Sequence, residues 1–278
     1  MPAMEIRPRR ATELVDASFQ LLRRFYAQLV TVSALAMAPG VICRIIERDA
    51  MSNPQLVVVN PWPFVGVGIV AILSIVVCDA VLTIAVSQGY IDGVIDLGQA
   101  FGIGIRRILY VLLASFFRGL LLTLVIFAVA AVFGVLSLMK TPAILVLLVP
   151  FVLWLVVYLL LRTFALTPIV LLENAGPNTA MGRTLHLTKN CAAHIFFSLG
   201  LAFFLYFIVS GIVTVLGLNL LTPTTAGIIG ALVIIPIYPL LSVVSTLLYY
   251  DLRIRKEGFD LEIMSRELGG VPAPIPAV

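Results

Sequence analysis

Charged side chains are scarce in this sequence, and their scarcity excludes a water-soluble globular domain. Only 12% of the 278 residues are charged, whereas 61% are hydrophobic. Soluble domains carry about twice that share of charge. The mean hydropathy of +1.13 agrees with a chain that lies in a membrane. We therefore expect one membrane domain, with no room for a separate soluble enzyme.

Histidine and cysteine are also few, which argues against metal and nucleophile chemistry. The two histidines, His186 and His194, fit no metal-ligand spacing and have no acidic residue near them in sequence. Cys43, Cys78 and Cys191 are widely spaced within apolar segments, which is typical of packing residues. The sequence also lacks a phosphate-binding loop and a nucleophile elbow. We predict no metal, no cofactor and no catalytic site.

What the sequence does contain is a series of long apolar segments. Six of them reach the ~20 residues that cross a ~30 Å hydrocarbon core. They are residues 27–46, 64–88, 108–139, 143–172, 191–220 and 226–250. Prolines inside these segments, among them Pro168, predict local kinks. The fold class predicted is all-α: a polytopic helical bundle with six transmembrane helices forming one domain over 1–262, followed by a flexible tail at 263–278.

The placement of lysine and arginine predicts the orientation of these spans. If the N-terminus is inside, the outer segments contain only Arg44, Arg48 and Lys140. The inner segments contain thirteen: Arg7, Arg9, Arg10, Arg23, Arg24, Arg106, Arg107, Arg183, Lys189, Arg253, Arg255, Lys256 and Arg266. Positive residues concentrate on the cytoplasmic side of membrane proteins. We therefore expect a multi-pass protein with both termini in the cytoplasm.

Three inner connections have helical rather than loop character. Each repeats apolar residues on one helical face next to basic ones, which is typical of amphipathic helices lying in the membrane interface. The faces comprise Val15, Phe19, Leu22, Tyr26 and Leu29; Leu97, Phe101, Ile105 and Ile108; and Met181, Leu185, Thr188 and Ala192. Thr12 is the predicted N-cap of the first. These helices begin near residues 12, 96 and 178, which fits an internal repeat in which one interfacial helix and two spans occur three times. The alternative is that any bundle with short outer loops shows a similar period.

The last span ends in the mixed-charge stretch YYDLRIRKEGFDLE. Asp251–Arg255 and Arg253–Glu257 have i,i+4 spacing if the helix continues to Gly258. Gly258 would then provide a left-handed C-cap, allowing Phe259 to fold back under the bundle. The predicted docking motif comprises Tyr250, Asp251, Arg253, Arg255, Lys256, Glu257, Gly258 and Phe259. The alternative is a solvated, charged helix end.

On these residues the chain resembles a known family. ELVDASFQLLRR, LRTFALTPIVLLENAGPNTAMGRTLHLTKN and above all YYDLRIRKEGFDLE resemble the membrane domain of bacterial glycerophosphoryl diester phosphodiesterases, which also occurs as stand-alone six-span proteins. The resemblance covers about 12–262 and departs from the family at Thr184 and at CAAH, residues 191–194. It implies a bacterial inner-membrane protein without the catalytic domain, so phosphodiesterase activity does not carry over.

Three charges fall inside the predicted spans: Asp79, Arg118 and Arg162. Counting along the spans places all three at one level, in or near the inner leaflet. Arginines at that depth are able to extend their guanidinium groups to the headgroups, whereas an aspartate side chain is too short. We predict that Asp79 faces the bundle interior and pairs with Arg118 or Arg162, which leaves the other arginine for a lipid phosphate.

Two functions remain open. The first is a non-catalytic membrane module that scaffolds or regulates membrane or cytoplasmic proteins. The second is a lipid-handling or transport protein that binds an anionic phospholipid headgroup at inner-leaflet arginines. A membrane-embedded enzyme is a distant third. The bilayer is the expected partner in every case, and nucleic acid is not.

Overall fold

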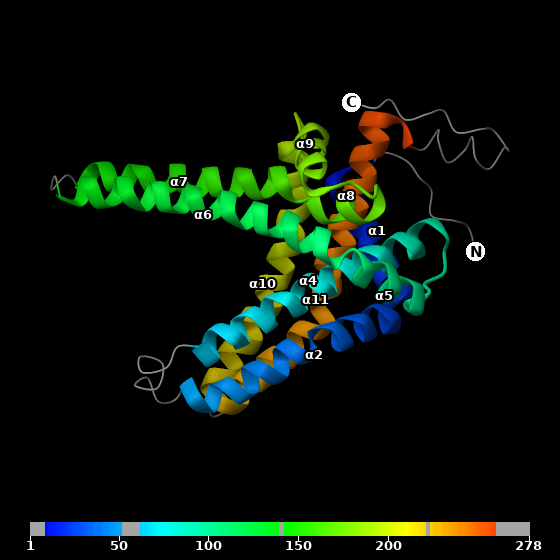
Figure 1. The fold of residues 1–278 in the computed structure, drawn as a ribbon, viewed down its shortest axis with the longest axis horizontal. Helices are drawn as coiled ribbons and strands as arrows, with labels where there is room; N and C mark the ends of the chain where they lie inside the picture. Colours follow the sequence, from blue (N-terminus) through cyan, green and yellow to red (C-terminus); the bar gives the residue numbers. More distant parts are fainter. Residues whose placement is uncertain (1–8, 52–61, 139–141, 221–222, 260–278) are drawn as a thin grey trace.

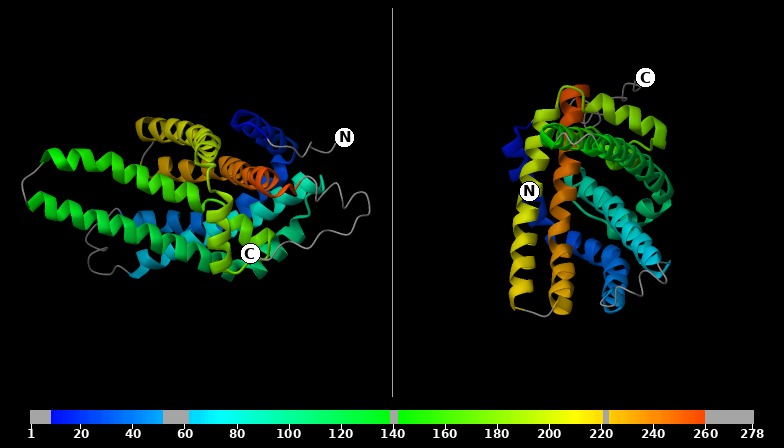
Figure 2. Two further views of the ribbon diagram at one scale, coloured as in Figure 1. Left: turned by 90° about the horizontal axis from the view of Figure 1, so that it is seen from above. Right: turned by 90° about the vertical axis from the view of Figure 1, so that its left-hand side faces the viewer.

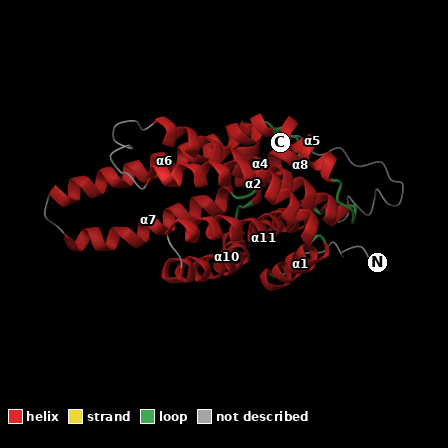
Figure 3. Cartoon of the chain, turned by 90° about the horizontal axis from the view of Figure 1, so that it is seen from below, coloured by secondary structure: helices red, strands yellow, loops and turns green. Residues whose placement is uncertain are grey.

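The computed structural model describes residues 9–51, 62–138, 142–220 and 223–259, and these residues form helices joined by short loops, with no strand among them (Figures 1 and 3). The helices are α1 (Ala11–Arg24), α2 (Tyr26–Met51), α4 (Trp62–Ile91), α5 (Leu97–Arg106), α6 (Ile108–Leu138), α7 (Pro142–Thr163), α8 (Leu166–Leu172), α9 (Pro177–Leu187), α10 (Ala192–Leu220) and α11 (Pro223–Glu257). Six candidate spans are long and apolar enough to cross a membrane. The predicted all-α membrane bundle is confirmed, while the tail 263–278 and Lys140 lie outside the described residues.

The fourth predicted span is not one helix. Residues 143–172 divide into α7 and the short α8, with a break at Phe164 and Ala165. Pro168 accounts for the break, because it has no N–H for the carbonyl of residue 164 and its ring clashes with that carbonyl in a continuous helix. The last span is longer than predicted, because α11 continues past residue 250 as far as Glu257.

The three short helices predicted at residues 12, 96 and 178 are α1, α5 and α9, which begin at Ala11, Leu97 and Pro177. Thr12 is not the N-cap, because α1 begins one residue earlier with Arg10 in the cap position. The prediction that the apolar face of α1 lies in the membrane interface also needs correction. Its apolar residues, including Leu14 and Leu21, are 1% exposed and pack against α10 and α11, so this face is covered by protein rather than lipid.

Helix α11 lies at the centre of the bundle and packs against α10, α2, α1 and α4. Its C-terminal half contributes a continuous buried stretch: Val243, Val244, Leu247, Leu248, Tyr249, Tyr250 and Leu252. The C-terminal half of α4 is buried in the same way, with Val81, Leu82 and Ala85 fully enclosed. We call the end of the bundle formed by α1, α5, α8, α9 and the C-terminal end of α11 the base.

The α6–α7 hairpin leaves this bundle at the base and diverges from the other spans (Figures 1 and 2). Only 11% of the residues in the α6 span are buried, against 56% in the α4 span. Large side chains such as Phe116, Leu124 and Phe127 are exposed along α6. Apart from Arg118 and Arg162 these helices are apolar, which is typical of faces that meet the bilayer.

Candidate functional site

Asp251 joins three separate segments of the chain near the base. One carboxylate oxygen accepts a hydrogen bond from the backbone N–H of Arg9 at 2.7 Å. The other lies 2.9 Å from Nε2 of His194 on α10 and 2.7 Å from Nε of Arg255, one turn further along α11. Arg255 also donates to the backbone carbonyl of Arg9. With the Asp251 side chain 3% exposed, these contacts hold the segment before α1 against α10 and α11.

A second polar cluster lies at the same end of α11. Arg183 on α9 forms ion pairs with Glu173 at 2.6 Å and with Glu257 at 2.8 Å. Arg253 pairs with the same two carboxylates, at 3.2 Å from Glu257 and 3.9 Å from Glu173. The hydroxyl of Tyr249 donates to Glu173 at 2.8 Å. Among the described residues, two guanidinium groups therefore face two carboxylates.

The electrostatics of Arg183 follow from this geometry. Partial burial by itself disfavours the charged guanidinium, but the hydrogen bonds and negative charges of Glu173 and Glu257 outweigh burial and raise the pKa of Arg183. The guanidinium of Arg183 is thus held in its charged form within the cluster. It ties α9 and the C-terminal end of α8 to the end of α11.

Aromatic contacts complete the C-terminal motif. The hydroxyls of Tyr250 and Ser87 are hydrogen-bonded to each other at 2.6 Å. The ring of Tyr250 stacks on Tyr90 at 5.4 Å and on Phe259 at 5.5 Å. Gly258 has φ 65°, the left-handed conformation predicted for it. Phe259 therefore turns back and lies 8% exposed, with the Arg253 guanidinium 4.1 Å from its ring centroid.

The predicted docking motif accordingly docks onto the rest of its own chain. Both predicted i,i+4 pairs form, and Lys256 donates to the carbonyl of Lys189 at 2.7 Å. Sequence reasoning missed the partners, namely Arg9, Glu173, Arg183 and His194. A signal was present for two of them, since Glu173 and Arg183 are only 10 residues apart, on either side of a short loop. His194 and Arg9 gave none, because their partner is 57 and 242 residues away.

The intramembrane charges are brought together only in part. The Asp79 carboxyl interacts electrostatically with Arg118 on α6 and with the hydroxyl of Thr167 on α8. Tyr238 on α11 lies within the same electrostatic environment. The neighbours of Asp79 thus come from α6, α8 and α11, which places its side chain toward the bundle. Within the described residues, neither Arg118 nor Arg162 comes within the 4.0 Å of a direct ion pair with Asp79.

Arg118 and Arg162 lie at one level of the hairpin. Each is 20 residues from the hairpin end of its helix, Leu138 for α6 and Pro142 for α7, which corresponds to about 30 Å of helix. Both are half-buried. Arg162 lies 5.9 Å from the ring centroid of Tyr158, and the part of the chain that the structure describes offers it no carboxylate within ion-pair distance. Of the two arginines, only Arg118 interacts electrostatically with Asp79.

No group of three histidine, cysteine or acidic residues lies together in a metal-binding arrangement within the described ranges. Comparisons with known proteins add no relative: no family model, no curated protein and no solved structure matches the chain. The resemblance to the phosphodiesterase membrane domain therefore stays a prediction.

Proposed function

We propose that this chain is a non-catalytic protein of a bacterial inner membrane that binds an anionic phospholipid of the cytoplasmic leaflet at Arg118 and Arg162. The base would then face the cytoplasm, as the distribution of lysine and arginine predicts. The observation that carries the proposal is the pair of arginines at one level of the exposed hairpin, neither of which forms a direct ion pair with a carboxylate of the described residues.

Charge and position both favour a phosphate as the missing anion. Two guanidinium groups and one carboxylate leave a net positive charge at the point where the hairpin leaves the bundle. Arginine binds phosphate oxygens through two parallel N–H donors, and it does so best where water is scarce. The exposed leucine and phenylalanine side chains of α6 and α7 provide an apolar surface along which acyl chains lie. A phospholipid offers both kinds of group in one molecule.

Lipid binding to the full chain in nanodiscs tests the proposal directly. Native mass spectrometry in mixed phosphatidylglycerol and phosphatidylcholine should retain phosphatidylglycerol on the wild-type protein. Arg162→Gln should lower the preference about fivefold, as expected for the loss of about 1 kcal/mol of attraction per arginine. Arg23→Gln, which removes the same charge from an exposed position on α1, is the matched control. Equal retention by wild type, Arg162→Gln and Arg118→Gln would refute lipid binding at this site.

Scaffolding of partner proteins is the second candidate, and one observation favours it. The α6–α7 hairpin exposes large aromatic and aliphatic side chains between Leu109 and Phe127 and between Phe151 and Leu160, and such a surface also suits the helices of another membrane protein. The docking motif itself is occupied by contacts within the chain, so it supports this function less. Crosslinking from Phe127 in intact membranes distinguishes the two: a discrete protein adduct favours the scaffold, and adducts with lipid alone favour lipid binding.

The topology is tested independently. Cysteines introduced at positions 53 and 222, both outside the described residues, should react with an impermeant thiol reagent in intact cells. A cysteine at position 265, also outside them, should not. Labelling with the opposite pattern would place the arginines in the outer leaflet and would contradict the proposed lipid source.

A further inference from the structure

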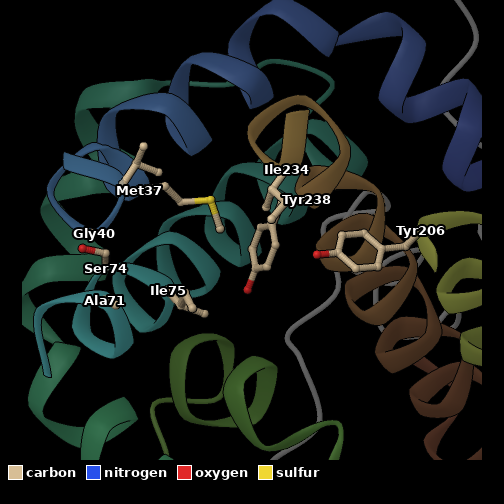
Figure 4. Close-up of a pocket in the computed structure, with 9 residues that line it drawn as sticks. Met37, Gly40, Ala71, Ser74, Ile75, Tyr206, Ile234 and Tyr238 are labelled. Atoms are coloured by element: carbon tan, nitrogen blue, oxygen red, sulfur yellow. The ribbon is translucent and has the colours of Figure 1, made fainter. Parts of the chain in front are cut away.

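A cavity of about 220 Å³ lies among α2, α4, α10 and α11, on the side of Asp79 away from the base. Its walls are largely apolar, with Met37, Ile75 and Ile234 among them. Three hydroxyl-bearing residues interrupt these walls: Ser74, Tyr206 and Tyr238. In Figure 4 the hydroxyl of Tyr206 points toward Tyr238, and both tyrosines line the same cavity.

These tyrosines are unusual for their depth. Tyrosine in membrane proteins concentrates at the interface, where its hydroxyl meets water and headgroups. Tyr206 instead lies 14 residues from either end of α10, or about 21 Å along the helix. None of the described residues forms a hydrogen bond with the hydroxyl of Ser74, Tyr206 or Tyr238. A hydroxyl without a partner in the hydrocarbon region is costly, which indicates that a ligand supplies the missing groups.

The size and shape of the space define the ligand further. A cavity of about 150 Å³ accommodates one benzene ring, so 220 Å³ suits one or two rings. A smaller apolar space of about 70 Å³ shares Tyr206 and Ile234 with it and continues between α10 and α11 past Val213 and Gly230. The two spaces together match a ring with an apolar tail. No charged residue in the described part of the chain lines either one, which favours a neutral ligand.

From these observations we infer that this cavity binds the ring of a neutral, membrane-soluble quinone or phenol. The ring oxygens accept hydrogen bonds from Tyr206, Tyr238 and Ser74, and the isoprenoid or alkyl tail follows the space between α10 and α11. An acyl chain of a bulk phospholipid fits less well, because it has no oxygen at this depth to satisfy the hydroxyls. The inference concerns binding alone and is independent of the phosphate site at Arg118 and Arg162.

Photolabelling of the full chain in phosphatidylcholine nanodiscs provides the test, with an azido derivative of ubiquinone-1 as the probe and unlabelled ubiquinone-1 as the competitor. Mass spectrometry should locate the label on peptides from α4, α10 or α11. Tyr206→Phe and Tyr238→Phe keep the rings but remove one hydroxyl each, so each should lower the affinity by about 2- to 12-fold, the range for one hydrogen bond. Tyr110→Phe, on the exposed face of α6, is the matched control and should change nothing.

Three results would overturn the inference: labelling spread evenly over the lipid-facing helices, wild-type affinity in the Tyr206→Phe/Tyr238→Phe double variant, or equal competition by palmitic acid. The thermal midpoint of each variant verifies that it is folded. Arg162→Gln should bind the quinone as the wild type does, which separates failure here from failure of the phospholipid proposal.

Discussion

Helices α6 and α11 have similar apolar character but very different surroundings. Half of the residues in the α11 span are buried within the chain, against 11% in the α6 span. Lipid is as apolar as leucine, so hydrophobicity alone does not bring membrane helices together, whereas small side chains and hydrogen bonds do. Helix α11 carries both, with Ser242 and Thr246 enclosed and the polar clusters at its end. Helix α6 presents mainly leucine and phenylalanine.

The largest expected effect comes from removing the central carboxylate of the base. Asp251→Asn should lower the stability by about 2–4 kcal/mol, because it leaves Arg255 and His194 without their common anion in a poorly hydrated site. The thermal midpoint of the detergent-solubilised protein measures the loss. Asp16→Asn, an exposed aspartate on α1, is the control. A midpoint equal to that of the control would mean that the base does not depend on this contact.

Removal of the Phe259 ring should cause the second-largest loss of stability. Phe259→Ala removes the ring that packs on Tyr250 and Arg253, and we expect about 2–3 kcal/mol, below the value for a phenylalanine in a full core. Gly258→Val should cost about 1–3 kcal/mol, because valine is strained at φ 65°. Rapid cleavage by protease within residues 251–259 of the folded wild type would contradict both expectations.

A smaller loss is expected from the charge cluster. Arg183 is 29% exposed, and water compensates part of the charge that its removal leaves behind. Arg183→Gln should therefore cost about 1–2 kcal/mol. A double-mutant cycle with Glu257→Gln checks the assignment: the two changes should not be additive if Arg183 acts through Glu257, whereas strict additivity would show that the pair contributes nothing.

The smallest effect should be seen on the hairpin. Phe127 is 73% exposed, so Phe127→Ala should change the stability by less than about 0.5 kcal/mol. The same thermal measurement gives the comparison with Phe259→Ala. If both phenylalanine variants lost equal stability, the hairpin would be packed against another protein or a second copy, and the contrast between α6 and α11 would not hold.

The number of spans and the short helices between them were predictable because both depend on local patterns. An apolar run of sufficient length forms a helix in a membrane, and amphipathic periodicity marks α1, α5 and α9. The C-terminal motif was predictable in part for the same reason: the i,i+4 pairs and the glycine cap lie within a few residues. The break before α8 shows the limit, since Pro168 indicated a disturbance without telling whether the helix would bend or end.

The sequence by itself determined an all-α chain of six spans, the positions of the short helices between them and the charged end of α11, because each follows from properties of neighbouring residues. Only the tertiary structure decided which helices enclose α11 and which diverge, and that the apolar face of α1 meets protein rather than lipid. It alone brought His194 and Arg9 to Asp251 and enclosed the hydroxyls of Tyr206 and Tyr238. Such contacts join residues far apart along the chain. They depend on how side-chain shapes fit between helices, and no local pattern encodes that fit.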